Sequence, residues 1–215
     1  MGGTEGGGHA PGRGTGRAAR AGPAHGRGAG HPVSWRVRVA TPADAEAIAQ
    51  VHWDSWVATY TGVFPQASFD AFPLAARREV WQREAANTAP GRRLLVAVAD
   101  LPASDAPVLG FACLGPYRRQ PHEAAEAGAG EGELTALYLR PGHFRRGIGR
   151  ALWQAVLQAA REIGYPALRL WVIAGNPAER FYAAMGALPV GHNVFDAHGT
   201  PVREHCCRVD LSSTD

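Results

Sequence analysis

Residues 140–150 combine glycine and arginine in a spacing that suits phosphate binding. Gly147 and Gly149 stand where an apolar, strand-like segment gives way to a segment of helical periodicity. The first turn of a helix leaves backbone N–H groups without partners, and glycine removes the side chain that would keep a phosphate away from them. Four positive charges, on Arg140, Arg145, Arg146 and Arg150, lie in the same stretch. These residues therefore predict an anion-binding turn at the start of a helix.

Two other phosphate-binding turns fit these residues less well. A Walker A loop requires lysine after its last glycine, where Arg150 stands, and the sequence contains no lysine. A dinucleotide fingerprint requires a small third residue, where Leu152 stands, and it belongs to the first strand of a domain. A bare Gly-x-Gly pair is also compatible with an ordinary tight turn before a helix. The neighbouring residues are therefore needed to distinguish a phosphate-binding turn from an ordinary one.

Hydrophobic periodicity predicts the elements that position this turn. Alternating polar and apolar residues and apolar runs of strand length predict strands at residues 35–39, 94–99, 108–114, 133–139, 167–173, 187–195 and 202–211. Apolar residues at helical spacing predict helices at residues 41–62, 69–83, 150–163 and 176–186. The first of these helices begins at Thr41-Pro42-Ala43-Asp44, which is typical of a helix start. The order of elements is mixed rather than strictly alternating, as in an α/β domain.

The N-terminal residues differ in composition from the rest of the chain. Twelve of the 27 glycines fall in residues 1–30, which hold no apolar side chain larger than alanine apart from Met1. Such a segment cannot bury enough surface to offset its ordering entropy, so we expect a disordered Gly/Arg-rich tail at residues 1–33 and one domain at residues 34–211. Four arginines and one glutamate in this tail leave 18 charges of each sign elsewhere. The net charge of +3 therefore belongs to the tail, which argues against a nucleic-acid-binding domain.

Cysteine usage and hydropathy indicate a cytoplasmic protein. Three cysteines, two of them adjacent, do not make a disulfide framework. No apolar run approaches the ~18–20 residues that span a bilayer, and the N-terminus lacks the apolar region of a secretory signal, so we expect no membrane contact. We also expect no metal site, because metal-ligand spacing is lacking among His192, His198, His205, Cys206 and Cys207.

Two motifs around the glycine turn resemble those of the GNAT superfamily of N-acyltransferases. In that superfamily a strand of the form Glu-Leu-x-x-Leu-Tyr-Val leads to (Gln/Arg)-x-x-Gly-x-(Gly/Ala). Residues 133–141 (ELTALYLRP) fit the first part and residues 147–152 (GIGRAL) the second, with Phe144 at the Gln/Arg position. A later family motif, Asn-x-x-Ala-x-x-Phe-Tyr-x-x-x-Gly-(Phe/Ala), resembles residues 176–187 (NPAERFYAAMGA), where the Asn-to-Tyr spacing is one residue shorter.

A third resemblance lies near the start of the domain. Residues 51–62 (VHWDSWVATYTG) are similar to the first helix of bacterial GNAT members that carry Val-His-x-x-Ser-Trp. The three motifs lie within residues 51–187, and the resemblance as a whole covers about residues 35–210. The resemblance implies the GNAT fold, an α/β fold with a single mixed, mostly antiparallel, six- to seven-stranded twisted sheet flanked by about four helices.

The resemblance further implies transfer of an acetyl group from acetyl-CoA to a primary amine of a small molecule or peptide, by direct attack in a ternary complex. Tyr182 is the candidate acid for the departing thiolate. Reference pKa values of about 10 for tyrosine and about 8.5 for a thiol make this proton transfer uphill by ~2 kcal/mol. Glu133 occupies the position from which some members take a general base. The alternatives for Glu133 are anchoring of the substrate cation and pairing with an arginine.

Residues that would bind the two substrates follow from the same motifs. The strand edge at Leu137, Tyr138 and Leu139 would pair with the peptide-like pantetheine arm of CoA. The remaining CoA-binding candidates are Arg145, Arg146, Gly147, Ile148, Gly149, Arg150 and Asn176. The amine acceptor would meet the N-terminal helices and the last hairpin, with Trp53, Asp54, Trp56 and Tyr60 as candidates. The competing interpretation is that these aromatic residues belong to the core.

A second class of function is compatible with the same fold. Phe144 and the shortened spacing between Asn176 and Tyr182 leave open a non-catalytic acyl-CoA-binding regulatory or interaction module. A homodimer is the default expectation for an enzyme of this size.

Overall fold

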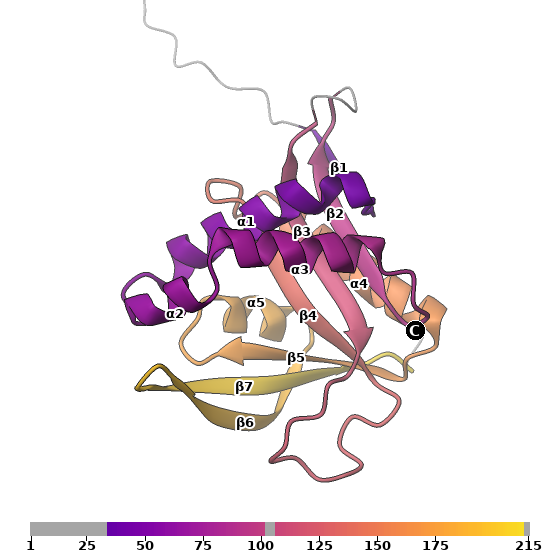
Figure 1. Ribbon diagram of the computed structural model, residues 1–215. Helices are drawn as coiled ribbons and strands as arrows, with labels where there is room; N and C mark the ends of the chain where they lie inside the picture. The colour runs from indigo at the N-terminus through magenta and orange to yellow at the C-terminus, as the bar shows by residue number, and fades with distance from the viewer. Residues whose placement is uncertain (1–33, 102–105, 213–215) are drawn as a thin grey trace, which may run out of the picture. The chain divides into compact units, whose positions relative to one another are not determined.

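The computed structural model describes residues 34–101 and 106–212 (Figure 1). The tail predicted at residues 1–33 lies outside the described residues. The strands are β1 (Trp35–Val39), β2 (Arg93–Ala99), β3 (Val108–Pro116), β4 (Gly132–Leu139), β5 (Ala167–Ile173), β6 (Leu188–Ala197) and β7 (Thr200–Asp210). The helices are α1 (Ala45–Tyr60), α2 (Gln66–Ala71), α3 (Leu74–Ala86), α4 (Ile148–Ile163) and α5 (Ala178–Ala184), with a 3₁₀ turn at Pro42–Asp44 before α1.

All seven strands form one sheet in the order β1-β2-β3-β4-β5-β7-β6. Only β4 and β5 run parallel, and every other neighbouring pair is antiparallel. The mixed, mostly antiparallel sheet predicted from the sequence is therefore confirmed. No helix in the described segments is long and apolar enough to cross a membrane.

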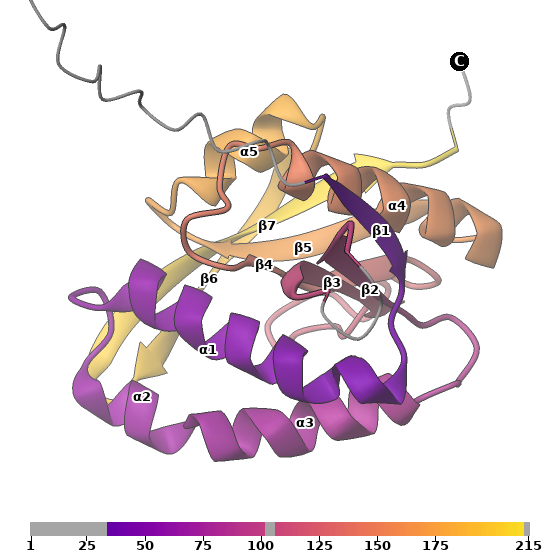
Figure 2. The same ribbon diagram turned by 90° about the horizontal axis from the view of Figure 1, so that it is seen from above.

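The helices cover both faces of the sheet (Figure 2). Helices α1 to α3 lie on one face and α4 and α5 on the other. Strand β2 shows why both faces are apolar: Val96 and Val98 pack in a core with α1 and α3, whereas Leu95 and Ala97 pack in a core with α4. Alternate residues of a strand point to opposite faces, so a strand covered on both sides is apolar throughout.

The second predicted helix is interrupted, which corrects the expectation of one helix over residues 69–83. Phe72 leaves the helical conformation, with φ −135° and ψ 65°, and Pro73 follows it. The residue before a proline is disfavoured in the α region, so the segment divides into α2 and α3. The sheet is accordingly flanked by five α-helices instead of about four.

Candidate active site

The parallel strands β4 and β5 part from each other at the centre of the sheet. Their pairing is confined to residues 132–134 of β4 with residues 168–170 of β5. Beyond these pairs the strands diverge (Figure 1). At Leu137 and Leu139, β4 pairs with β3 on one side and has no strand partner on the side that faces β5. The backbone groups on that side therefore remain available. An extended, peptide-like ligand can bind to such an edge.

The glycine turn forms the N-terminus of α4, as predicted. Gly147 is the N-cap residue and has φ +82°, a backbone conformation that L side chains rarely adopt. Its carbonyl oxygen accepts a hydrogen bond from Ala151 N–H, which closes the first turn of the helix. Arg145 is a non-glycine residue with positive φ, at +61°. Arg145, Arg146 and Arg150 are exposed, so three positive charges lie in solvent around this helix N-terminus.

The turn lies beside the far end of β4 and against α5. A Cβ atom at Gly149 would lie 3.6 Å from Leu139 Cδ1 and 3.8 Å from Phe181 Cζ. Arg140 Nε, just after β4, is buried and has no hydrogen-bond partner in the described part of the chain. The strand edge and the glycine turn predicted to hold CoA therefore lie next to each other, with Phe181 of α5 beside them.

Tyr182 is buried on α5 and keeps its proton. Its side chain is 7% exposed, and its ring lies 5.6 Å from that of Trp153 and 5.2 Å from that of Phe181. Burial raises the pKa of Tyr182, and the neighbouring Tyr60 and Cys207 add to the shift. The phenol is therefore a proton donor at every physiological pH.

Asn176 connects α5 with α1. Its Oδ1 accepts a hydrogen bond of 2.9 Å from Ala178 N–H, and its Nδ2 donates one of 3.1 Å to Tyr60 Oη. Tyr60 was predicted as an acceptor-binding residue and Asn176 as a CoA-binding residue. A residue predicted to bind CoA and a residue predicted to bind the acceptor are therefore in direct contact.

Glu133 is a buried carboxylate at the start of β4 that pairs with the largely exposed Arg118. It is 2% exposed, and its carboxylate accepts hydrogen bonds from three groups of Arg118: the backbone N–H, Nε and Nη2. Of the roles predicted for Glu133, this geometry favours pairing with an arginine over service as a base, because the oxygens already have partners.

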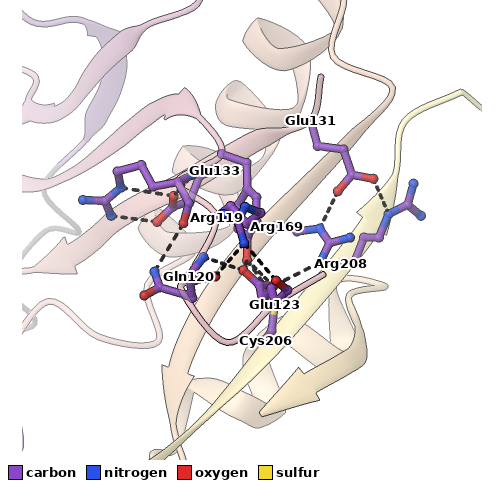
Figure 3. Close-up of polar contacts among 10 residues, drawn as sticks. Arg119, Gln120, Glu123, Glu131, Glu133, Arg169, Cys206 and Arg208 are labelled. Carbon is purple, nitrogen blue, oxygen red and sulfur yellow. Dashed lines mark hydrogen bonds and ion pairs between the residues drawn. The ribbon is translucent and has the colours of Figure 1, made fainter. Parts of the chain in front are cut away.

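The loop between β3 and β4 is held by a second set of ion pairs close to Glu133 (Figure 3). Glu131 lies between Arg169 of β5 and Arg208 of β7 and accepts a hydrogen bond from each. Tyr117 donates a hydrogen bond to Glu123 in the same loop, at 2.7 Å. These contacts fix the closed end of the diverging strands.

A cavity of about 430 Å³ lies on the α1 side of the gap between the strands. Tyr138 of β4 and Trp171 and Ile173 of β5 line it, so it adjoins both diverging strands. The other large aromatic residues that line it come from α1, the segments before and after α2, and β6: Trp56, Tyr60, Phe64, Phe72 and Phe195.

The predicted acceptor residues divide between this cavity and its surroundings. Trp56 and Tyr60 line the cavity. Trp53 instead packs edge-on against Phe69, with ring centroids 6.5 Å apart, and Asp54 accepts a hydrogen bond from Gln50 one helical turn away. Tyr138, predicted on the CoA side through its backbone, directs its side chain to the acceptor side.

A buried polar cluster supports the aromatic wall of the cavity from behind. His52 Nδ1 accepts a hydrogen bond of 2.9 Å from Trp81 Nε1, and His52 Nε2 lies 2.6 Å from Arg77 Nη1. Arg77 is fully buried, and its Cζ lies 4.9 Å from the ring centroid of Trp56 and 4.4 Å from that of Phe72. Burial and the charge of Arg77 lower the pKa of His52 to about 3, so His52 is neutral.

Glu204 of β7 is a lining residue that the sequence prediction missed. It accepts a hydrogen bond of 3.2 Å from Asn193 Nδ2, and burial raises the pKa of its carboxyl group. One signal was present in the sequence: on a strand over residues 202–211, Glu204 shares a face with the apolar Val202 and Cys206. An acid on a buried face indicates either a partner or a function. Phe64 and Phe195 were also missed, and they lack a comparable signal.

Metal binding has no structural support in the described segments. Nowhere in residues 34–101 and 106–212 do three or more His, Cys, Asp or Glu side chains gather so that they could hold an ion.

Comparison with known proteins agrees with this arrangement. The model of the Acetyltransferase (GNAT) family matches residues 46–187. The uncharacterized N-acetyltransferase YuaI of Bacillus subtilis (strain 168) is 30% identical over 168 residues, which cover 78% of this chain and 88% of that protein.

Two solved structures share the fold at low sequence identity. The PaiA N-acetyltransferase of Thermoplasma acidophilum, solved in complex with coenzyme A, has a TM-score of 0.58 and 22% identity, and the match covers 80% of this chain and 98% of that one. The acetyltransferase YncA of Salmonella typhimurium, solved with acetyl-CoA, has a TM-score of 0.62 and 18% identity, with coverages of 84% and 95%. The family match, the relative and the fold lead to the same conclusion: the chain belongs to the GNAT family of acetyltransferases.

Proposed function

We propose that this protein transfers the acetyl group of acetyl-CoA to a primary amine of a small molecule or peptide, by direct attack in a ternary complex. The observation that carries the proposal is the meeting of a glycine-capped helix N-terminus, an unpaired strand edge and a buried tyrosine at one gap in the sheet. The CoA and acetyl-CoA bound to PaiA and YncA support the same donor.

The residues at the gap fit a CoA molecule. The N–H groups of Gly147, Ile148 and Gly149 would receive the pyrophosphate, with the flanking arginines adding charge. Arg140 Nε is buried without a partner in the described chain, and an anion would satisfy it. The open edge at Leu137 and Leu139 would pair with the pantetheine arm. Acetyl-CoA supplies the acetyl group as a thioester, which is activated toward an amine.

Tyr182 is the residue that we propose as the proton donor. In the reaction a bond forms between the amine nitrogen and the acetyl carbon, the carbon–sulfur bond breaks, the sulfur gains a proton, and the nitrogen loses one. The raised pKa of Tyr182 makes the phenol a weaker acid than a free tyrosine, so full proton transfer to the sulfur costs more than the ~2 kcal/mol expected from reference pKa values, and the hydroxyl acts first as a hydrogen-bond donor to the developing thiolate. A buried hydroxyl stabilises such charge more strongly than water does.

Glu133 has a positioning role in this proposal. Its ion pair with Arg118 fixes the β3–β4 loop to the start of β4, next to the point where β4 and β5 separate. The amine proton is therefore assigned to another acceptor.

The first helix supports membership of the subgroup with Val-His-x-x-Ser-Trp. Val51, His52 and Ser55 are buried, whereas Trp56 lines the cavity. We propose that the motif serves to place this tryptophan, with His52 fixed by Trp81 beneath it.

Location and assembly complete the proposal. We propose a cytoplasmic enzyme whose catalytic domain spans residues 34–211 and which forms a homodimer. Cys113, Cys206 and Cys207 are free and buried, which suits a reducing compartment.

The test is an acetyl-CoA titration followed by an amine panel with thiol detection. We expect acetyl-CoA to raise the melting temperature while NAD and ATP do not, and we expect free CoA to be released only when an amine is present. Stabilisation by acetyl-CoA without thiol release for any amine would support the alternative, a non-catalytic acyl-CoA-binding module. Absence of saturable stabilisation would refute both.

A further inference from the structure

We infer that the cavity binds an arylalkylamine, a primary amine on a short chain attached to an aromatic ring, with the amine nitrogen at Glu204. The inference rests on the proposed function, because it names the acceptor of that reaction.

Part of the cavity wall is aromatic. The Trp56 ring is stacked on that of Phe64, with centroids 5.3 Å apart and an interplanar angle of 17°. Phe64 in turn lies 6.5 Å from Phe195, at an angle of 28°. These nearly parallel rings come from α1, the segment after it and β6, and together they form an aromatic wall against which the ring of a ligand can pack. The volume of about 430 Å³ lies low in the range of roughly 300–1,000 Å³ for small-molecule sites, which favours a small acceptor.

The charges at the cavity favour a cation without a carboxylate. Among the described lining residues the charged side chains are Asp196 and Glu204, with His198 as a further titratable group, and no arginine lines the cavity. A zwitterionic amino acid would place its carboxylate near these acids without a compensating cation. An amine that carries only positive charge gains from both the acids and the aromatic faces.

Glu204 is better placed than Asp196 to receive the amine. Both oxygens of Asp196 are within hydrogen-bond distance of Gly199 N–H at the β6–β7 turn. Glu204 lies deeper, and in the described chain its only side-chain donor is Asn193, to one oxygen. The second oxygen can accept a hydrogen bond from an ammonium group. Because burial raises the pKa of Glu204, this carboxylate takes up the amine proton more readily than an exposed one.

Transfer kinetics with four acceptors test the ligand class. The acceptors are 2-phenylethylamine, L-phenylalanine, spermidine and a peptide with a free N-terminal alanine, each at saturating acetyl-CoA with the full chain. L-Phenylalanine differs from 2-phenylethylamine by the carboxylate alone. We expect kcat/KM for 2-phenylethylamine to exceed that of each other acceptor by about tenfold or more. Equal or better use of L-phenylalanine, spermidine or the peptide would overturn the inference.

Two matched pairs of variants test the residues. We expect Glu204→Gln to lower kcat/KM for 2-phenylethylamine by about tenfold or more while the Kd of CoA stays unchanged. Its control is Glu79→Gln, at an exposed position of α3. We expect Phe195→Ala to raise KM by about fivefold or more, whereas Val194→Ala, its exposed neighbour on β6, leaves KM unchanged. Unchanged kinetics in both Glu204→Gln and Phe195→Ala would refute the inference.

Calorimetry separates failure of this inference from failure of the proposed function. Binding of 2-phenylethylamine to the CoA-loaded protein is measured without turnover. Binding that is weakened by Glu204→Gln supports the inference even if no amine is acetylated, in which case the transferase proposal fails alone. Transfer to other amines without binding of 2-phenylethylamine overturns the inference alone.

Discussion

The two sides of the gap in the sheet are built from different kinds of groups. On the CoA side, the groups that would contact the ligand are backbone groups of one continuous stretch, from the edge of β4 to the first turn of α4. On the acceptor side, the lining consists of side chains from α1, α2, β4, β5, β6 and β7 and the segments beside them, most of which lie far apart in the sequence. A backbone site depends on local conformation, whereas a side-chain site depends on how distant elements pack. The first is therefore visible in a local motif and the second requires the fold.

Two glutamates, the buried Glu133 and the half-buried Glu204, show the same difference. Glu133 belongs to the CoA-side motif, and all three of its hydrogen bonds come from Arg118. Glu204 lies at the acceptor cavity and accepts from a neutral amide, that of Asn193. A carboxylate whose two oxygens are already paired with an arginine has little left to offer a ligand. One with a free oxygen in a cavity is available to a ligand.

The largest effect should follow from Tyr182, which lies between the two sides. We expect Tyr182→Phe to lower kcat by about a hundredfold or more while the Kd of acetyl-CoA changes less than about twofold, because only proton donation is lost. Stopped-flow turnover and calorimetry measure the two quantities. Tyr165→Phe is the matched control. It removes a partly buried hydroxyl that donates a hydrogen bond to the carbonyl oxygen of Gly91, away from Tyr182. Equal kcat values for wild type and Tyr182→Phe would exclude Tyr182 as the acid.

A smaller effect should isolate the backbone character of the CoA side. Gly147 and Gly142 have φ of +82° and +83°, and neither has a neighbour closer than 3.6 Å to an added Cβ. Valine at either position is strained by a similar amount, about 1–3 kcal/mol. Of these two variants, we expect only Gly147→Val to raise the Kd of CoA. The rise should be about tenfold, because this substitution alters the backbone N–H groups at the start of α4. A similar rise in Gly142→Val would mean that strain, and not phosphate binding, accounts for the effect.

The sequence was sufficient for the parts of the molecule that depend on local rules. Strand patterns, the helix start at Thr41 and the turn at Gly147 all rest on interactions within a few residues, and the sheet and α4 formed where expected. The break at Pro73 was missed because apolar spacing continued across it. The ion pair of Glu133 with Arg118 remained one alternative of several. It joins a residue of β4 to one 15 positions earlier, in a loop of irregular conformation. Glu204 and Phe195 reach the cavity only through the register of β6 and β7.

A third effect concerns pH and should be confined to the acceptor side. The imidazole of His52 takes up a proton near pH 6.5 when unfolded but only near pH 3 when folded. Its contribution to stability is therefore complete above about pH 6.5 and declines as the pH falls toward 3. We expect the free energy of unfolding to drop by about 2 kcal/mol between pH 6.5 and pH 5 on this account. Denaturant unfolding at several pH values measures the drop.

Replacement of His52 separates this contribution from that of the carboxyl groups. His52→Gln is expected to be less stable at pH 7, because Trp81 and Arg77 lose their partner, yet its stability should fall by about 2 kcal/mol less between pH 6.5 and pH 5. His192→Gln, at an exposed position of β6, should retain the wild-type slope. Hydrogen exchange at pH 5 should accelerate in α1 and α3 before α4, since His52 supports the wall that holds Trp56. Simultaneous acceleration in α4 would mean that the two sides of the gap do not differ in their dependence on buried side chains.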